Sequence, residues 1–161
     1  MNRSDTDKNL LPDLQLAVRW EDVEKELCET GAGGMNAEHE LNLETLELKP
    51  FVPAKDFELS KRFYLDLGFQ IPWSSDELAY LHCGNCTFLL QNFYVKSLAE
   101  NFMMHLSVQN VDDWRAHVRE QQIAETYGVV VSEPEQRPWR MRDFMLYDPS
   151  GVLWRIAENT D

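Results

Sequence analysis

The stretch MRDFMLYDPSGVLWRIAEN, residues 141–159, decides the fold of this chain. Apolar and polar residues alternate on both sides of Asp148-Pro149-Ser150-Gly151, which is typical of a tight turn, since proline fixes φ at about −65° and glycine permits the reversal. The pattern predicts a β-hairpin. In its second strand, alternation places Leu153, Arg155 and Ala157 on one face and Val152, Trp154 and Ile156 on the other. We therefore expect Trp154 to pack beneath helices.

The hairpin ends the second of two similar segments, residues 46–95 and 103–159. Each segment predicts a strand, a helix and further strands, which indicates a duplicated α+β unit. Asp56 is the candidate N-cap of the first helix, and Asp112 is the candidate N-cap of the second. One face of the first helix carries the residues expected in the core: Ser60, Phe63, Tyr64 and Leu67.

Residues 1–45 form a predicted acidic extension, with 11 acidic and 4 basic residues. Within it, an apolar stripe at helical spacing predicts a helix over residues 14–29: Leu16, Trp20, Val23 and Leu27. We expect disorder in residues 1–9 and mobility in the glycine-rich residues 31–34. The main domain is predicted to span residues 46–159.

The net charge of −13 argues against binding nucleic acid phosphates or an anionic membrane surface. No apolar run approaches the about 20 residues of a membrane-spanning helix, and the first residues do not resemble a signal peptide. We expect a cytoplasmic protein whose partner is a small molecule or another protein.

The three cysteines, Cys28, Cys83 and Cys86, suit a reducing compartment, because an odd and sparse set is no disulfide framework. The sequence Cys83-Gly84-Asn85-Cys86 permits a redox or zinc interpretation. No second cysteine pair accompanies it, and Gly84-Asn85 is typical of a two-residue hairpin turn, which is the favoured interpretation.

The duplicated unit, the segment FYLDLGF at residues 63–69 and the segment DPSGVLWRIAE at residues 148–158 resemble the vicinal oxygen chelate superfamily. This superfamily includes glyoxalases, extradiol dioxygenases and bleomycin-resistance proteins. The segment PWRMRDFMLYDPSG, residues 138–151, is most similar to bleomycin-resistance-like and glyoxalase-like members. The resemblance implies two βαβββ modules whose curved mixed sheets surround a pocket, preceded here by the helical extension.

Enzymes of this superfamily hold a metal with residues on the first and last strand of each module. Seven residues before Asp56 and Asp112 lie Lys49 and His105, and the last strands supply Gln91 and Arg155. Lysine and arginine have no available lone pair near neutral pH, so we expect a pocket without metal or other cofactor. A register slip would instead bring in Asp143 or Glu158.

The resemblance therefore implies a ligand pocket without identifiable catalytic residues, lined by Lys49, Gln91, Phe93, His105, Trp139 and Arg155. Two roles stay open for Arg155: contact with an anionic or carbonyl-bearing ligand, or an ion pair with Asp143 or Glu158. His105 is either a ligand contact or an ordinary strand histidine.

Three hypotheses for function follow. The favoured one is a metal-independent protein that binds a hydrophobic, partly anionic or carbonyl-bearing small molecule. The second is a metal-dependent isomerase, lyase or dioxygenase of the same superfamily, and the third is a protein-interaction module. The resemblance and the apolar stripe of residues 16–27 predict a homodimer.

Overall fold

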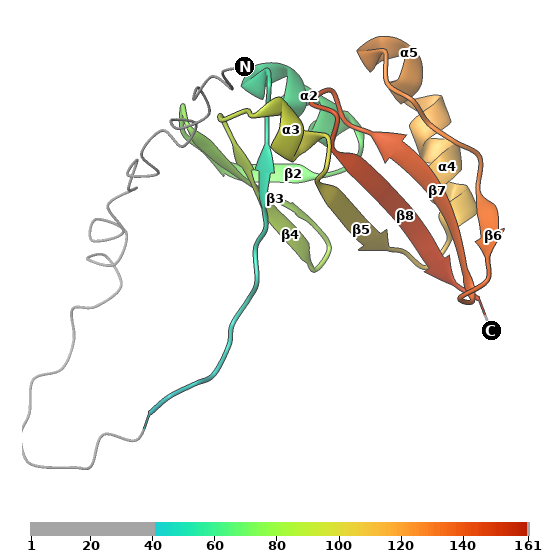
Figure 1. The fold of residues 1–161 in the computed structure, drawn as a ribbon, viewed down its shortest axis with the longest axis horizontal. Helices are drawn as coiled ribbons and strands as arrows, with labels where there is room; N and C mark the ends of the chain where they lie inside the picture. The colour runs from blue at the N-terminus through green and yellow to red at the C-terminus, as the bar shows by residue number, and fades with distance from the viewer. Residues whose placement is uncertain (1–40, 161) are drawn as a thin grey trace, which may run out of the picture. The chain divides into compact units, whose positions relative to one another are not determined.

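The computed structural model describes residues 41–160 (Figure 1). The predicted helix over residues 14–29 and the predicted mobile segments 1–9 and 31–34 lie outside the described residues. The chain from Thr45 onward forms a compact unit. None of the helices in its described part is long and apolar enough to cross a membrane.

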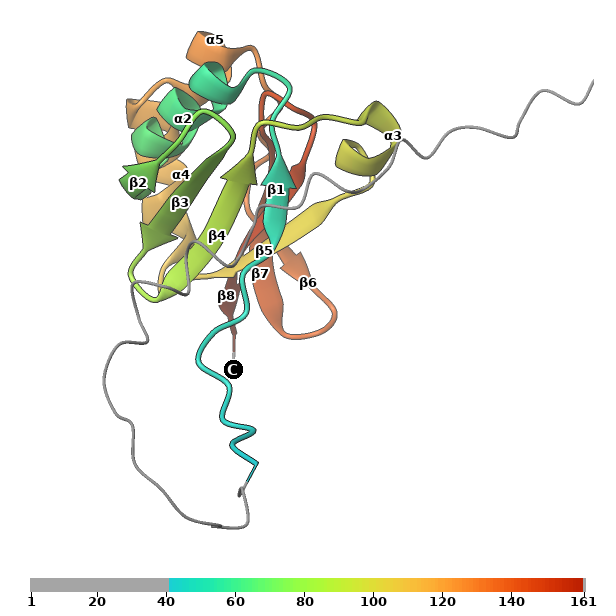
Figure 2. The same ribbon diagram turned by 90° about the vertical axis from the view of Figure 1, so that its left-hand side faces the viewer.

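The first module contains one helix and a four-stranded mixed sheet. Strand β1 pairs in parallel with β4, whereas β4 with β3 and β3 with β2 are antiparallel. The sheet order is β1-β4-β3-β2, which Figure 2 shows face-on. In chain order the elements are β1 (Phe51–Pro53), α2 (Phe57–Asp66), β2 (Gln70–Ser74), β3 (Leu78–Cys83) and β4 (Cys86–Gln91).

The second module repeats this topology after the short helix α3 (Lys96–Ala99). Its sheet order is β5-β8-β7-β6, with β5 and β8 parallel, and α4 packs on β7 and β8 (Figure 1). Its elements are β5 (Met103–Ser107), α4 (Val111–Glu120), α5 (Ile123–Tyr127), β6 (Glu135–Arg137), β7 (Met141–Tyr147) and β8 (Leu153–Asn159). The predicted α+β class with two mixed sheets is confirmed.

The edge strand of the second sheet is the polar β6. The three valines at 129–131 before it form only an isolated bridge, between Val131 and Leu146. An edge strand has one row of pairing groups exposed, so polar residues are well tolerated there.

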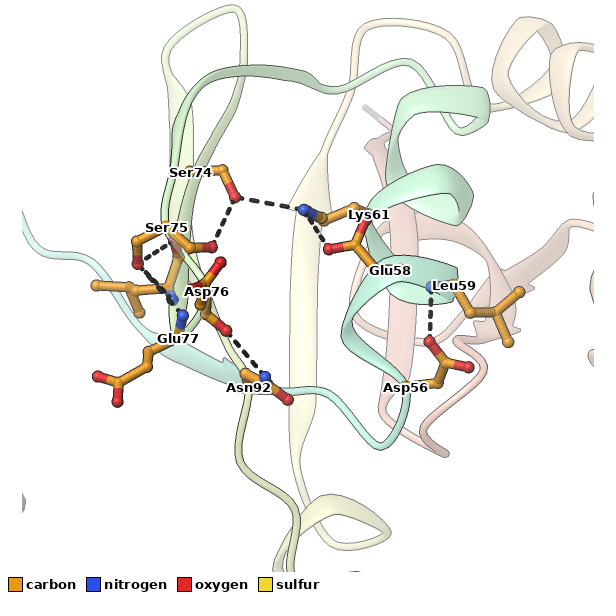
Figure 3. A network of polar contacts seen from close by, with 10 residues as sticks. Asp56, Glu58, Leu59, Lys61, Ser74, Ser75, Asp76, Glu77 and Asn92 are labelled. Atoms are coloured by element: carbon orange, nitrogen blue, oxygen red, sulfur yellow. Dashed lines mark hydrogen bonds and ion pairs between the residues drawn. The ribbon is translucent and has the colours of Figure 1, made fainter.

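The two long helices begin at different kinds of cap. The Asp56 side chain accepts a hydrogen bond from the Leu59 amide at 2.9 Å, as predicted (Figure 3). On the same helix Lys61 pairs with Glu58 at 2.6 Å and lies 3.4 Å from the Ser74 hydroxyl of β2, which ties α2 to its sheet.

The predicted cap of the second helix is wrong. Asn110 is the N-cap of α4, and its Oδ1 accepts from the amides of Asp112 and Asp113 at 3.0 and 3.1 Å. Asparagine is as effective an N-cap as aspartate. The carboxylates of Asp112 and Asp113 instead lie in the first turn of the helix, where the helix dipole favours negative charge.

One apolar core joins the modules. Tyr64 of α2 lies with its ring centroid 4.9 Å from that of Phe88 in β4 and 5.7 Å from that of Trp154 in β8. Trp154 is buried beneath α2, as its alternation predicted. The helix face expected in the core is buried as well: Ser60, Phe63, Tyr64 and Leu67.

A buried polar network fastens the Asp148–Gly151 turn to the first module. The Tyr64 hydroxyl donates to Asp148 Oδ2 at 2.7 Å, and Trp154 Nε1 donates to the Tyr64 hydroxyl at 3.2 Å. Asp148 Oδ1 accepts from the amides of Ser150 and Val152 at 2.9 and 2.8 Å. Gly151 has φ +88°, a conformation that disfavours any residue with a side chain. The turn is therefore both a local reversal and a contact between modules.

Burial raises the pKa of Asp148 to about 6, although the hydrogen bonds from Tyr64 and the turn amides lower it. Burial and the neighbouring Asp148 charge also raise the pKa of Tyr64. Between about pH 4 and pH 6 the folded protein keeps the Asp148 proton while the unfolded chain has lost it. The contribution of this carboxyl to stability therefore falls as the pH rises through that window.

We predict that Asp148→Asn removes this pH dependence. The free energy of unfolding of the wild type, relative to that of D148N, should fall by about 2 kcal/mol between pH 4 and pH 6.5, measured by urea denaturation. The control is Asp112→Asn, because the Arg142 hydrogen bond lowers the pKa of this exposed carboxyl, so its contribution to stability does not fall as the pH rises. A difference between wild type and D148N that stays constant with pH would contradict the assignment.

Candidate functional site

Each sheet has one face in the shared core and one face turned away from it. Val52, Phe88 and Leu90 are buried in the core, so their neighbours along β1 and β4 point outward. Trp154 and Ile156 of β8 are also buried in the core, so their neighbours along β8 point outward. We call the outward faces of the β1-β4-β3-β2 and β5-β8-β7-β6 sheets the first and the second outer face.

A row of apolar and aromatic side chains crosses the first outer face. Phe51 of β1 is in register with Leu89 of β4, Leu89 with Tyr80 of β3, and Tyr80 with Trp73 of β2. Phe51 and Trp73 remain 43% and 53% exposed. This row offers a flat apolar surface suited to a planar ligand.

The corresponding row of the second outer face is polar. His105 of β5 is in register with Arg155 of β8, and Arg155 with Met145 of β7. His105 is exposed and Arg155 is half-buried. The structure thus brings two of the predicted site residues together, a hydrogen-bonding imidazole beside a guanidinium.

A buried carboxylate holds Arg155 in place. Asp143 is only 1% exposed, and its Oδ2 accepts from Arg155 Nη1 at 2.6 Å while its Oδ1 accepts from Arg137 Nε at 2.7 Å. Arg137 also pairs with Glu135 at the exposed edge, at 3.0 Å. Two guanidiniums and two carboxylates therefore meet here, and the buried Asp143 carboxylate fixes the position of the Arg155 guanidinium.

Of the two partners considered for Arg155, Asp143 is the one it contacts. Glu158 lies on the opposite face of β8 and accepts from the Val111 amide at 2.9 Å, at the start of α4. The ion pair leaves other N–H groups of Arg155 for a ligand, because a guanidinium has five donors.

The remaining predicted site residues lie apart from this row. Lys49 precedes β1, pairs with Glu47 and has its ammonium 5.5 Å from the Tyr80 ring centroid. Gln91 is in register with Pro53 and Leu78, at the end of β4. The two loop aromatics are 47% and 58% exposed, Phe93 just after β4 and Trp139 between β6 and β7. A ligand role for these four residues stays a prediction.

The correct helix cap also corrects the equivalence of the modules. Matching Asp56 with Asn110, rather than with Asp112, makes Phe51 and not Lys49 the counterpart of His105. Leu89, the partner of Phe51, then replaces Gln91 as the counterpart of Arg155. Only His105 in the resulting set can coordinate a metal, so these residues do not fit a divalent ion. No group of three potential ligands occurs among the described residues.

We predict that Arg155→Met destabilises the protein by about 2 to 3 kcal/mol, because Asp143 would keep a buried oxygen without its charged partner. Urea denaturation measures the change. The matched control is Arg142→Met on the adjacent strand. Its partner Asp112 is exposed, so this variant should lose little stability. Adding Asp143→Asn to R155M should restore part of the loss, and equal effects of R155M and R142M would contradict the assigned role of Asp143.

The comparisons with known proteins agree with this architecture. Residues 45–156 match the model of the Glyoxalase/Bleomycin resistance protein/Dioxygenase superfamily. A bleomycin-binding protein solved with bleomycin has 23% identity and a TM-score of 0.60, and the match covers 71% of this chain and 99% of that one. An antibiotic-binding protein, TnmS3, from Streptomyces sp. CB03234 has 20% identity and a TM-score of 0.60, over 74% of this chain and 100% of that one.

A glyoxalase/bleomycin resistance protein/dioxygenase from Nocardioides has 18% identity and a TM-score of 0.56, over 75% of this chain and 88% of that one. At these identities the structures show a common fold. The search of curated proteins found no significant match. The family model covers most of the chain, and the chain belongs to the glyoxalase/bleomycin resistance protein/dioxygenase superfamily.

Proposed function

We propose that this protein is a metal-independent binding protein for a hydrophobic small molecule that carries a carboxylate or carbonyl group. The observation that supports this most is the contrast between the two rows. The first outer face presents the apolar row of Phe51, Leu89, Tyr80 and Trp73, and at the equivalent place the second presents His105 and Arg155.

The two rows suit different parts of one ligand. Tyr80 and Trp73 can stack on a planar apolar body, and Arg155 can donate to an oxygen anion in a charge-assisted hydrogen bond. Asp143 fixes the Arg155 guanidinium before the ligand arrives, which reduces the conformational entropy that binding must remove. Two structural neighbours are a bleomycin-binding protein and an antibiotic-binding protein, so a role in sequestering a natural product fits this surface.

We also propose that the pocket forms in a homodimer. In the described part of the chain, large apolar side chains remain exposed on the outer faces, including Trp73 and Met103 at 53% and 58%. A two-fold axis that sets the first outer face of one copy against the second outer face of its partner would cover both and create two equal pockets. We place this dimer in the cytoplasm, because a sparse, odd set of three cysteines suits a reducing compartment.

We predict that R155M weakens binding of anionic ligands by roughly ten- to a hundredfold, because one charge-assisted hydrogen bond is lost. The measurement is calorimetry at 15 °C with aromatic carboxylates and with their neutral amides, alongside bleomycin as a natural-product probe. Neutral amides should bind R155M nearly as well as they bind the wild type. Equal losses for amides and carboxylates would show that the variant damages the fold and not a ligand contact.

The same titrations test metal independence. The affinity for these ligands should be unchanged after dialysis against EDTA. Of the residues at the four equivalent strand positions, Phe51, Leu89, His105 and Arg155, only His105 can coordinate a metal. Near-stoichiometric zinc, nickel, iron or manganese in the purified protein, lost in His105→Ala, would overturn the proposal and favour a metal-dependent enzyme.

The homodimer has a separate test. Light scattering should give the mass of two chains, and Met103→Glu should shift the protein toward a monomer because it buries a charge between the outer faces. Leu65→Glu is the matched control, since Leu65 is a similarly exposed apolar residue on α2. A monomeric wild type at micromolar concentration would contradict the dimer, and a dimer that survives deletion of residues 1–40 would place the contact in the main domain.

A further inference from the structure

The tip of the β3–β4 hairpin carries two thiols that the ligand site does not use. Cys83 ends β3, Cys86 begins β4, and the two residues are direct partners across the turn. Gly84, with φ +56°, supplies the left-handed conformation that a two-residue turn needs at this position. Directly opposed residues have Cα atoms about 4.5 to 5.5 Å apart, within the range of about 4.4 to 6.8 Å that a disulfide spans.

The two thiols have different surroundings. Cys86 is exposed. Cys83 is half-buried and lines a cavity of about 270 Å³, together with Leu67, Gly68, Asp113, Trp114 and His117. Burial, and then the nearby Cys86, raise the pKa of the Cys83 thiol. A reagent in solution therefore meets Cys86 first, with Cys83 held beside it as a second thiol.

The hairpin alone does not account for both sulfur atoms. A two-residue turn requires particular backbone conformations at Gly84 and Asn85, not thiols at the flanking positions. Cys86 adds nothing to the core, because it is exposed. A structural zinc site needs four ligands, and no group of three potential ligands occurs within the described part of the chain. A pair of adjacent thiols with one exposed member instead suits thiol–disulfide exchange.

We propose that Cys83 and Cys86 form a dithiol site that reacts with low-molecular-weight disulfides and closes to a reversible intramolecular disulfide. The Cys86 thiolate attacks one sulfur of the small disulfide and forms a mixed disulfide, and the first small thiolate leaves and takes up a proton. Cys83 then loses its proton and attacks the Cys86 sulfur, which releases the second small thiol. Two cysteine thiols are oxidised, and one small disulfide is reduced to two thiols.

The strands that this bond would link carry Tyr80 and Leu89 in the row of the first outer face. Closing the hairpin would restrict their relative motion, so the oxidation state of the pair acts on the surface proposed to bind the ligand. The chemical step itself does not depend on that proposed function.

The test uses the full chain with Cys28→Ser, which leaves only this pair of thiols. The protein is incubated with glutathione disulfide, alkylated with iodoacetamide and analysed by intact and peptide mass spectrometry. We expect a product lighter by two hydrogen atoms, with Cys83 and Cys86 linked, no glutathione adduct, and both thiols recovered after dithiothreitol.

Two single variants in the same background report the order of the steps. Cys83→Ser should accumulate a glutathione adduct on Cys86, because the second thiol is missing. Cys86→Ser should react roughly tenfold or more slowly, because the remaining thiol is half-buried. An unreactive pair, a lasting glutathione adduct on the pair, or a covalent dimer through Cys86 would overturn the proposal, and fast reaction of C86S would overturn the order of attack.

Discussion

The buried carboxylate of Asp148 is the constraint on which the two-module arrangement depends. One oxygen accepts hydrogen bonds from the Ser150 and Val152 amides at the turn, and the other accepts a hydrogen bond from the Tyr64 hydroxyl of the first module. Burying a carboxylate without partners is strongly unfavourable, so each hydrogen bond is needed to offset desolvation. Because the same side chain closes the β7–β8 turn and binds α2, the geometry of the second sheet and its position against the first module are set together. Trp154 strengthens this coupling, since it packs against Tyr64 and also donates to its hydroxyl.

The core constrains one face of each sheet and leaves the other free to differ between modules. The inward residues of both modules are apolar and share one cluster. At equivalent outward positions, however, the first module has Phe51 and Leu89 where the second has His105 and Arg155. Asp143 makes the polar row possible, because a half-buried Arg155 without a counter-charge would be costly to desolvate. Duplication thus supplies two matching backbones, and the side chains turned away from the core determine what each can bind.

Local patterns in the sequence predicted most of the fold. The turn at Asp148, the alternation around Trp154 and the buried face of α2 follow from properties of neighbouring residues, and all are present. The site was less predictable, because its rows depend on the register of parallel strands that are separated in the sequence by one or two helices and two further strands. The choice of Asp112 over Asn110 as the cap was a two-residue error, which moved the inferred counterpart of His105 from Phe51 to Lys49. The Gly84-Asn85 turn alone is enough to place Tyr80 opposite Leu89. The register of β2 against β3, however, shifts between Gln70 and Trp73, and this shift hides the position of Trp73.

The charge of the whole chain and the charge of the outer face act over different distances. The net charge of −13 repels anions from the protein as they approach. At physiological ionic strength, however, the Debye length is about 8 Å, so distant carboxylates are screened at the second outer face, where the guanidiniums of Arg137 and Arg155 lie beside the carboxylates of Asp143 and Glu135. A polyanion would find few donors in this charge-balanced cluster and would be repelled by the surrounding surface through each of its charges. The proposed ligand, with one anionic group on a large apolar body, would avoid most of that repulsion and would also contact the row of Phe51, Leu89, Tyr80 and Trp73. Electrostatics and shape therefore favour the same class of ligand.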